Sequence, residues 1–281
     1  MNDLVKNFSF QGVSGAFSEM AGKEVYQSAI SIPCKTFEEM FEKVRDQEAE
    51  IAIVPIENSR AGRVGDTQRL IPDSKLKIIG EYFLEVNHCL LGIPGSTIQE
   101  IKRVHSHEQA IAQCRNNLIK HNKDMIVAAD TAGAAKMVSE LNQKEDAAIA
   151  SELAAKTYSL DILQNNFQDS EKNVTRFLIM SNNLNTPDSN DDDLMTTLVF
   201  ELKSIPAALY KALGGLASNG VNMTKLESYI NPQGFDVAQF YADIEGHPEN
   251  HKVKLALEEM KYYCKHVDIL GVYKMSNFRK K

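Results

Sequence analysis

Ile51-Ala52-Ile53-Val54-Pro55 is a continuous apolar run. A strand that is buried on both faces of a parallel sheet has this composition. Residues 125–129 and 147–150 repeat the pattern, and residues 8–11 form a shorter strand. Each run is followed by small or polar residues and then by a helical pattern. This alternation predicts an α/β fold with a largely parallel sheet.

The expected helices are residues 106–120, 131–141 and 151–158, and each opens with Ser or Thr, which cap helix N-termini. Residues 101–105 read as a strand with partial alternation. Residues 78–92 (IIGEYFLEVNHCLLG) read as long strand material. We expect this segment to cross from one α/β lobe to a second, which makes the region two-lobed.

The polar, acidic segment at residues 182–193 (NNLNTPDSNDDD) is predicted to be a linker between residues 1–181 and residues 194–281. Beyond it the order is strand, helix, strand, strand, helix, strand, the ferredoxin-like βαββαβ unit. The expected bounds are residues 196–200, 206–219, 222–230, 235–245, 248–261 and 267–273. A module this small gains stability by pairing with a second copy.

Composition excludes several classes of protein. The net charge of −7, with 31 Lys+Arg against 38 Asp+Glu, is mildly acidic, so no nucleic-acid partner is expected. No apolar run reaches the ~18 residues of a membrane span. The first residues, MNDLVK, lack the features of a signal peptide. We therefore expect no membrane association and a cytoplasmic location.

Neither a disulfide framework nor a metal site is predicted. The cysteines are far apart in sequence and read as reduced, structural thiols: Cys34, Cys89, Cys114 and Cys264. His105 and His107 lie across a strand-to-helix boundary with no fourth ligand nearby, and we interpret Ser106 as the helix cap there. His247 and His251 flank a proline at a helix start, and we expect no metal there.

Four polar segments follow predicted strands or begin one. A glycine turn at residues 12–18 (GVSGAFS) presents N–H groups to an anion at a helix N-terminus. Residues 55–67 and 105–109 are dense in acid, amide and hydroxyl groups. In residues 173–177 (NVTRF), Arg176 needs water, a carboxylate partner or an anionic ligand. Together these segments predict a cleft for a small anion, a carboxylate rather than a nucleotide.

Five segments in this order resemble the prephenate dehydratase family, over nearly the whole chain: residues 12–18, 54–67, 104–110, 130–135 and 173–177. The C-terminal βαββαβ unit looks like an ACT regulatory domain. The resemblance implies two α/β lobes like a type II periplasmic binding protein, with the active site between them. It implies conversion of prephenate to phenylpyruvate, water and carbon dioxide in phenylalanine biosynthesis, without a cofactor. The first segment begins so early that we expect a monofunctional enzyme, without a preceding chorismate mutase segment.

The same resemblance implies the site residues. The catalytic set is Thr175, Arg176, Phe177, Glu57, Asn58 and Gln109, and the substrate-binding set is Ser14, Gly15, Ser59, Ser106, Thr131 and Ala132. Thr175 is expected to donate a hydrogen bond to the leaving oxygen, because a Thr hydroxyl is too weak an acid to be deprotonated. Arg176, Ser14, Ser106 and Thr131 would bind carboxylates. In a regular strand, however, Arg176 faces away from Thr175 and Phe177. Either the strand is irregular there, or Arg176 acts through the cleft wall.

Phenylalanine is the effector that the resemblance implies, bound at an interface between two copies in a homodimer or homotetramer. The implied effector residues are Ala208, Leu209, Asn219, Gly220, Val221, Asn222, Met223, Glu227 and Ser228. Three segments depart from the family pattern: Glu108 stands for a usual Pro, Ala207 for Gly, and Tyr229-Ile230 for Arg-Pro. The last two leave the strength and sign of regulation open.

Two alternatives remain open from the sequence. Arogenate dehydratase acts on a substrate with an amine in place of the side-chain keto oxygen, and nothing in one sequence separates it from prephenate dehydratase. A non-catalytic sensor of small carboxylates or amino acids is the second alternative, although the Thr-Arg-Phe segment at residues 175–177 argues against it.

Overall fold

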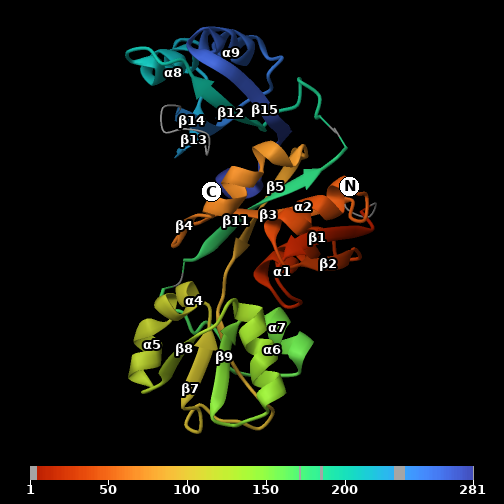
Figure 1. Cartoon of the computed structure of the whole chain (residues 1–281), viewed down its shortest axis with the longest axis vertical. Coiled ribbons are helices and arrows are strands. Elements are labelled where there is room, and N and C mark those ends of the chain that lie inside the picture. Colours follow the sequence, from red (N-terminus) through yellow and green to blue (C-terminus); the bar gives the residue numbers. More distant parts are fainter. Residues whose placement is uncertain (1–4, 171, 184–185, 231–237, 281) are drawn as a thin grey trace. The chain divides into compact units, whose positions relative to one another are not determined.

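The computed structural model describes residues 5–170, 172–183, 186–230 and 238–280 (Figure 1). The chain forms two compact units. Unit 1 comprises Met1–Val64 and Tyr82–Phe177, and unit 2 comprises Gly65–Glu81 and Leu178–Lys281. Residues 65–81 and 178–181 thus pack with the C-terminal part, although the sequence groups them with the first 181 residues.

The first part of unit 1 contains parallel strands of a larger sheet, in which β1 pairs with β2 on one side and with β3 on the other. The apolar run of β3 is buried from Ile51 to Val54, as predicted, and packs beside the buried Phe8 and Phe10 of β1. Helix α2 begins after Thr36, whose hydroxyl accepts a hydrogen bond from the Glu39 N–H at 3.1 Å. The elements are β1 (Asn7–Gln11), α1 (Phe17–Val25), β2 (Ile30–Cys34), α2 (Phe37–Arg45), β3 (Ile51–Asn58) and β4 (Gly62–Arg63).

The second part of unit 1 is a five-stranded sheet in the order β10-β6-β9-β7-β8. Strand β9 is buried on both faces because helices cover both (Figure 1). Ala147 and Ile149 pack with α4 and α5, whereas Ala148 and Ala150 pack with α6 and α7. The elements are β6 (Cys89–Gly92), β7 (Arg103–Ser106), α4 (Glu108–Gln113), α5 (Arg115–Lys120), β8 (Asp124–Val127), α6 (Thr131–Leu141), β9 (Asp146–Ala150), α7 (Glu152–Tyr158) and β10 (Asp161–Gln164).

The prediction of a buried strand at residues 125–129 is wrong. Strand β8 lies at the edge of its sheet, where β7 is its neighbour. Ile126 is 39% exposed and Val127 is 66% exposed. A strand at the edge of a sheet can have an apolar composition while its side chains stay exposed to solvent. The apolar run at residues 125–129 was therefore not enough to predict that the strand is buried.

The single helix predicted at residues 106–120 is also wrong. Ser106 is the last residue of β7, and its buried hydroxyl donates to the Ile149 carbonyl oxygen at 2.6 Å. The cap of α4 is instead His107, whose ring accepts from the Gln109 N–H, and a second helix, α5, starts after Cys114. Helix α6 starts at Thr131 as predicted, but Asp130 caps it.

Unit 2 contains a βαββαβ unit, as the sequence predicts, and its strands lie in the sheet order β13-β14-β12-β15. β15 also pairs in parallel with β5, at Gly271 and Ile78. The elements of the βαββαβ unit are β12 (Leu194–Leu202), α8 (Ala208–Ser218), β13 (Met223–Ile230), β14 (Ala238–Glu245), α9 (His251–Tyr263) and β15 (Cys264–Lys274). The others are α3 (Gly65–Leu70), η1 (Pro72–Ser74), η2 (Asn277–Lys280), and β5 (Lys77–Glu85) and β11 (Val174–Ser181), which both continue into unit 1.

Helices α8 and α9 pack side by side against one face of this sheet (Figure 1). They approach closely at Gly215, where a Cβ atom would lie 2.8 Å from the Ala256 carbonyl oxygen. Both helices start two or three residues later than predicted, and Asn250 caps α9. Strand β14 is described from Ala238, so residues 235–237 of the predicted strand lie outside the described residues.

A polar network lies within unit 2. The Asp243 carboxylate is fully buried and accepts from the Thr197 hydroxyl at 2.6 Å. The Arg279 guanidinium pairs with both carboxylate oxygens of Glu81, at 2.7 Å and 3.0 Å, and its Nη2 lies 3.8 Å from Asp243. Charges this deeply buried require such partners, so η2 is fixed to β5.

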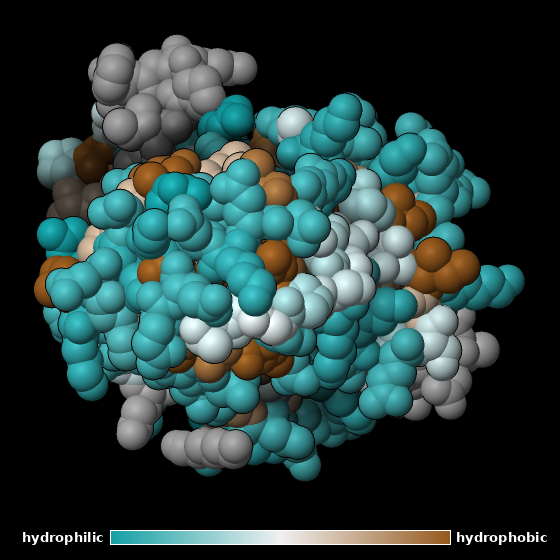
Figure 2. Space-filling model, turned by 90° about the horizontal axis from the view of Figure 1, so that it is seen from below, coloured by the Kyte–Doolittle hydropathy of each residue, from teal (hydrophilic) through white to brown (hydrophobic). Residues whose placement is uncertain are grey.

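The described part of the chain has no helix that is both long and apolar enough to traverse a lipid bilayer. All four cysteines are buried free thiols, as predicted. The face in Figure 2 is mostly hydrophilic, with small separate hydrophobic patches. Most large apolar side chains of the described residues are buried, as in an ordinary globular fold.

Candidate active site

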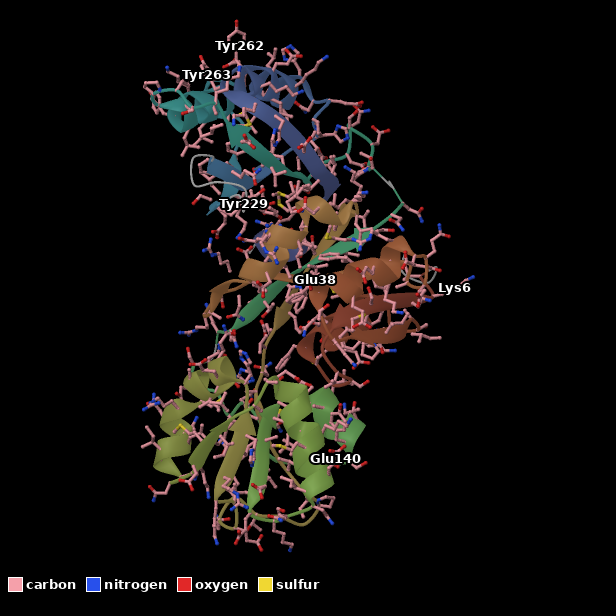
Figure 3. The ribbon with its side chains drawn as sticks, viewed as in Figure 1. Lys6, Glu38, Glu140, Tyr229, Tyr262 and Tyr263 are labelled. Carbon is pink, nitrogen blue, oxygen red and sulfur yellow. The ribbon has the colours of Figure 1, made fainter. Side chains whose placement is uncertain are left out.

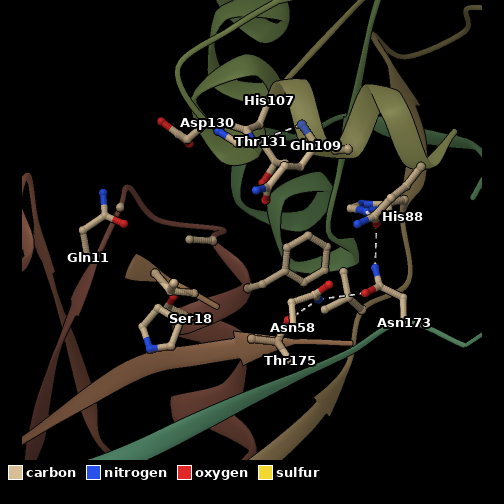
Figure 4. A pocket seen from close by; sticks show the side chains of 18 of the residues that line it. Gln11, Ser18, Asn58, His88, His107, Gln109, Asp130, Thr131, Asn173 and Thr175 are labelled. Atoms are coloured by element: carbon tan, nitrogen blue, oxygen red, sulfur yellow. Dashed lines mark hydrogen bonds between the residues drawn. The ribbon is translucent and has the colours of Figure 1, made fainter. Parts of the chain in front are cut away.

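Unit 1 contains a pocket of about 240 Å³, close to the lower end of the range for small-molecule sites, about 300–1,000 Å³. It lies at the carboxyl ends of β1, β3, β7 and β8, where parallel strands present their ligand-binding residues (Figure 4). The described residues that line it are Gln11, Gly12, Ala16, Phe17, Ser18, Pro55, Asn58, Val64, Val86, His88, His107, Gln109, Ala110, Gln113, Asp130, Thr131, Asn173, Thr175 and Phe177.

The pocket combines apolar walls with neutral hydrogen-bonding groups and one carboxylate, that of Asp130. Phe17 and Phe177 are the aromatic rings in its lining. None of the described residues in the lining is Lys or Arg. The first residues of α1 and α6, including Phe17, Ser18 and Thr131, contribute to the wall, and helix N-termini carry partial positive charge. An anion in this pocket would therefore meet amides, hydroxyls and helix ends.

Strand β11 alternates regularly through residues 174–177. Thr175 and Phe177 line the pocket, whereas the Arg176 side chain is 1% exposed and does not belong to the lining. The Arg176 guanidinium lies 3.1 Å from a carboxylate oxygen of Glu57 and 6.0 Å from the centre of the Phe83 ring. The strand is thus regular, and Arg176 lies within the wall behind the pocket.

Asn58 holds the Thr175 hydroxyl oxygen. Its Nδ2 donates to Thr175 Oγ1 and to Asn173 Oδ1, both at 2.8 Å (Figure 4). Its Oδ1 accepts from the backbone N–H groups of Arg60 and Ala61, both at 2.8 Å. Because backbone N–H groups only donate, they fix which end of the Asn58 amide faces Thr175. The Thr175 oxygen is therefore an acceptor from Asn58, and its proton is available to another acceptor.

The hydrogen-bonded chain continues beyond Asn58. Asn173 Nδ2 donates to Gln113 Oε1 at 2.7 Å, and His88 Nε2 lies 2.9 Å from the same oxygen. Asn173 and His88 are 4% and 3% exposed, so these contacts are shielded from solvent. Burial lowers the pKa of the His88 imidazole, and the contact with Gln113 offsets this in part.

The other catalytic and substrate-binding residues expected from the sequence are placed as follows. Gln109 and Thr131 line the pocket, and Glu57 lies beside Arg176 in the wall. The Ser59 hydroxyl accepts from the Val174 N–H at 2.9 Å, which fixes the start of β11. Ser106 and Ala132 are fully buried and do not belong to the described pocket lining.

Ser14 and Gly15 contact the second sheet's helices. The Ser14 carbonyl accepts from the Tyr158 hydroxyl, and the Gly15 carbonyl accepts from the Ser151 hydroxyl, both at 2.6 Å. At Gly15 the backbone has φ of +92°, and a Cβ atom would lie 2.7 Å from Ala154 Cα. This position needs glycine because α7 approaches so closely.

Sequence reasoning missed His88 and Gln113 and did not include Asn173 among the site residues. His88 stands in an apolar segment (FLEVNHCLLG), and a buried polar residue there is a signal. The sequence shows none of their partners. Within the described residues, no group of three or more His, Cys, Asp or Glu side chains is placed to hold a metal ion.

The expected effector residues all lie in unit 2. Ala208 and Leu209 are in the first turn of α8, and residues 219–222 connect α8 to β13. The Asn219 amide donates to Glu259 at 2.9 Å, and the Asn222 amide donates to Glu245 at 2.9 Å. Gly220 has a φ of +64°, and Val221 and Met223 pack against the core of the sheet. Glu227 lies 3.4 Å from Lys225 Nζ, and Ser228 is exposed.

Two departures from the family pattern have visible structural consequences. Ala207, which caps α8, has a left-handed backbone with φ of +58°, a conformation that favours glycine. Tyr229 lies on β13 (Figure 3) and is partly buried, and burial raises its pKa to about 12. Tyr229 is therefore neutral at physiological pH and does not replace the cation of the family motif.

The pocket and the two sheets of unit 1, with helices on their faces, define an α/β protein with a pocket of the kind that binds small molecules. The family model of prephenate dehydratase matches residues 8–185. The chain therefore belongs to the prephenate dehydratase family, a family of lyases, which confirms the resemblance seen in the sequence.

Several relatives match along most of the chain. A bifunctional N-acyl-homoserine lactone acylase/prephenate dehydratase of Komagataeibacter europaeus is 46% identical and covers 97% of each chain. Arogenate dehydratase 2 of Petunia hybrida is 36% identical over 94% of this chain and 71% of its own. The crystal structure of prephenate dehydratase in complex with L-Phe from Arthrobacter aurescens is 33% identical, with a TM-score of 0.87, and covers 96% of this chain and 90% of that one.

Proposed function

We propose that this chain converts prephenate to phenylpyruvate, water and carbon dioxide, with Thr175 as the hydrogen-bond donor to the leaving hydroxyl group. The observation that carries the proposal is the contact of Thr175 Oγ1 with the Asn58 amide at 2.8 Å. Since that contact occupies the oxygen as an acceptor, the hydroxyl proton is directed to a different partner. Thr175 belongs to the lining of the pocket, so a bound substrate supplies that partner.

The reaction breaks two bonds of the substrate ring. The bond to the ring carboxylate breaks as carbon dioxide leaves, and its electron pair moves through the ring and expels the hydroxyl group opposite. The ring becomes aromatic only when this C–O bond has also broken, and the oxygen leaves with the hydrogen bond of Thr175. A Thr hydroxyl is too weak an acid to remain deprotonated, so the final proton of the product water comes from solvent. The protein supplies stabilisation of the leaving oxygen and orientation of the dianion.

The two carboxylates of prephenate need donors, and the described pocket lining contains no Lys or Arg. We assign them to the first-turn N–H groups of α1 and α6, with the side chains of Thr131 and Gln109. Phe17 and Phe177 would contact the ring. Arg176, paired with Glu57, would contribute a positive potential through the wall instead of a direct contact.

Arogenate is the second candidate substrate. Its ammonium group would find a carboxylate in the pocket, because Asp130 belongs to the lining. One Asp130 oxygen already accepts from the Gly133 N–H at 2.6 Å, which holds the side chain at the start of α6. The comparison of kcat/KM for the two substrates separates the candidates, and an Asp130→Asn variant that loses only arogenate turnover would support the second.

We further propose that residues 194–281 form an ACT regulatory domain that binds phenylalanine between two copies of the chain in a homodimer or homotetramer. Support comes from the βαββαβ order and from the relative of known structure, whose crystals contain L-Phe. Residues 208–209, 219–223 and 227–228 would form the site. Titration calorimetry of the full chain with phenylalanine, run beside activity and light scattering, tests this proposal. An active enzyme that is monomeric and does not bind phenylalanine at millimolar concentration would refute the proposed regulatory domain.

The decisive experiment for the catalytic proposal is phenylpyruvate formation, followed by its ultraviolet absorbance in alkali. Thr175→Ala should lower kcat by about 10²–10³-fold, as removal of one transition-state donor typically does. Thr175→Ser, which keeps the hydroxyl group, is the matched control and should retain most of the activity. Wild-type turnover in a folded Thr175→Ala protein would refute the assignment.

A further inference from the structure

The orientation of the hydrogen-bonded chain at the pocket follows from its fixed end at Asn58. There the N–H groups of Arg60 and Ala61 require the Asn58 oxygen to face them. Asn58 then presents its NH₂ to Asn173, so Asn173 presents an oxygen there and its own NH₂ to Gln113. Each amide in the series therefore has a single compatible orientation.

The same logic determines the state of the His88 ring. Gln113 must present its oxygen to Asn173, and that oxygen is 2.9 Å from His88 Nε2. A neutral imidazole carries one N–H, and here it must be on Nε2, because two bare acceptors would repel. Among the described residues, the buried His88 Nδ1 has no hydrogen-bond partner. A bare nitrogen tolerates the lack of a partner better than an N–H group does, which also places the proton on Nε2. Burial also lowers the pKa of His88, which keeps the ring neutral.

We propose that His88 is a positioning residue for the reaction: its Nε2–H donates to Gln113 and so adds to the backbone N–H groups at Asn58 in holding the series in the orientation that leaves the Thr175 proton free for substrate. This inference rests on the proposed role of Thr175. Without the donor of His88, the Gln113 amide can turn over and present NH₂ to Asn173. That change favours the reversed orientation of Asn173, which removes an acceptor from Asn58.

Three substitutions at His88 separate positioning from packing. His88→Gln places an amide nitrogen at about the reach of Nε2, whereas His88→Asn is shorter and His88→Leu has no donor. We expect kcat of the Gln variant within about threefold of wild type, and kcat about five- to tenfold lower in the Asn and Leu variants, the loss of one neutral hydrogen bond. KM should change by less than about threefold in all three, because His88 is not assigned to the substrate carboxylates.

The matched control is His105, a second buried histidine of unit 1. It is 7% exposed, its Nε2 contacts Asp146 at 2.7 Å, its Nδ1 has no partner among the described residues, and it does not belong to the pocket lining. His105→Leu should lower stability and leave kcat unchanged. An equal loss of kcat in His88→Gln and His88→Leu would mean that ring shape matters instead of the donor, and would overturn the inference.

A second readout does not depend on activity. Nitrogen-15 NMR of the wild-type protein at neutral pH should show the His88 ring protonated on Nε2 and bare on Nδ1. A ring protonated on Nδ1 would overturn the orientation of the whole series, whatever the kinetics. If the wild-type protein makes no phenylpyruvate from prephenate while this ring state is found, the proposed function fails and the orientation stands. The two failures are therefore distinguishable.

Discussion

Asn58→Asp is an isosteric change that reverses the hydrogen bonding of Thr175. The carboxylate keeps both bonds from the Arg60 and Ala61 N–H groups, and being charged it accepts them more strongly. It lacks the amide NH₂ group, which in the wild-type protein donates to Thr175 and to Asn173, both at 2.8 Å. The Thr175 hydroxyl then donates to the new carboxylate, which is a better acceptor than a leaving alcohol. The proton needed by the leaving oxygen is thus turned away from the pocket.

The expected loss follows from removal of one donor at the transition state. Such a donor contributes about 2.7–4 kcal/mol, so kcat should fall by about 10²–10³-fold. Folding should survive, because the two backbone N–H groups stay paired. Kinetics of phenylpyruvate formation give kcat, and urea unfolding followed by circular dichroism gives the free energy of unfolding.

Asn87→Asp is the control for added charge. Asn87 is exposed, and its Oδ1 accepts from the Gln168 amide at 3.1 Å, a bond that a carboxylate preserves. This variant should keep wild-type kcat. If Asn58→Asp retains kcat within twofold of wild type, or if Asn87→Asp loses as much, the assigned direction of the Thr175 hydroxyl is wrong.

Three further predictions concern stability, each measured by urea unfolding. Glu57→Ala should lower the free energy of unfolding by about 3 kcal/mol, which is more than Arg176→Met should cost. The reason is that Arg176, whose side chain is 1% exposed, is the buried member of this ion pair. Equal losses of stability in the two variants would contradict this prediction. The pKa of Asp146 is lowered, first by its hydrogen bonds with Arg103, so its contribution is present above pH ~4 and is lost as the pH falls through the folded pKa. The stability gap between wild type and Asp146→Asn should therefore narrow between pH 5 and about pH 2, and a constant gap would refute the assignment. Ala207→Gly should raise the free energy of unfolding by about 0.5–1 kcal/mol. The left-handed backbone costs an alanine about 1–2 kcal/mol, which exceeds the entropy cost of glycine. A loss of stability in this variant would count against strain at the helix cap.

The sequence predicted the fold where local patterns determine it. The βαββαβ order and the buried run of β3 follow from periodicity, which each segment carries by itself. Burial of β8 did not follow, because its sequence resembles that of β9 while its position is at the edge of the sheet. Position within a sheet depends on pairing with distant segments, and no local pattern records it.

The candidate active site also has features that local sequence predicts and features that depend on distant residues. The alternation of strand residues predicted that Arg176 and Thr175 face opposite ways. In the structure Thr175 lines the pocket, whereas Arg176 is buried in the wall behind it. The partners of Thr175 were not predictable in the same way, since Asn58 is 117 residues away in sequence. His88 gave a weak signal as a polar residue in a largely apolar stretch, but only the spatial arrangement joins it to Gln113.

The contact between Arg279 and Glu81 has a consequence for the protein during its synthesis. These two residues are 198 positions apart, and both belong to unit 2, whose first segment is residues 65–81. At about 5–20 residues per second, a ribosome takes roughly 10–40 s to make the intervening chain. Throughout that interval the Glu81 carboxylate lacks its guanidinium partner, while much of unit 1 has already emerged. Nascent chains stalled before Arg279 should therefore expose β5 to protease, and chains extended beyond it should protect that strand.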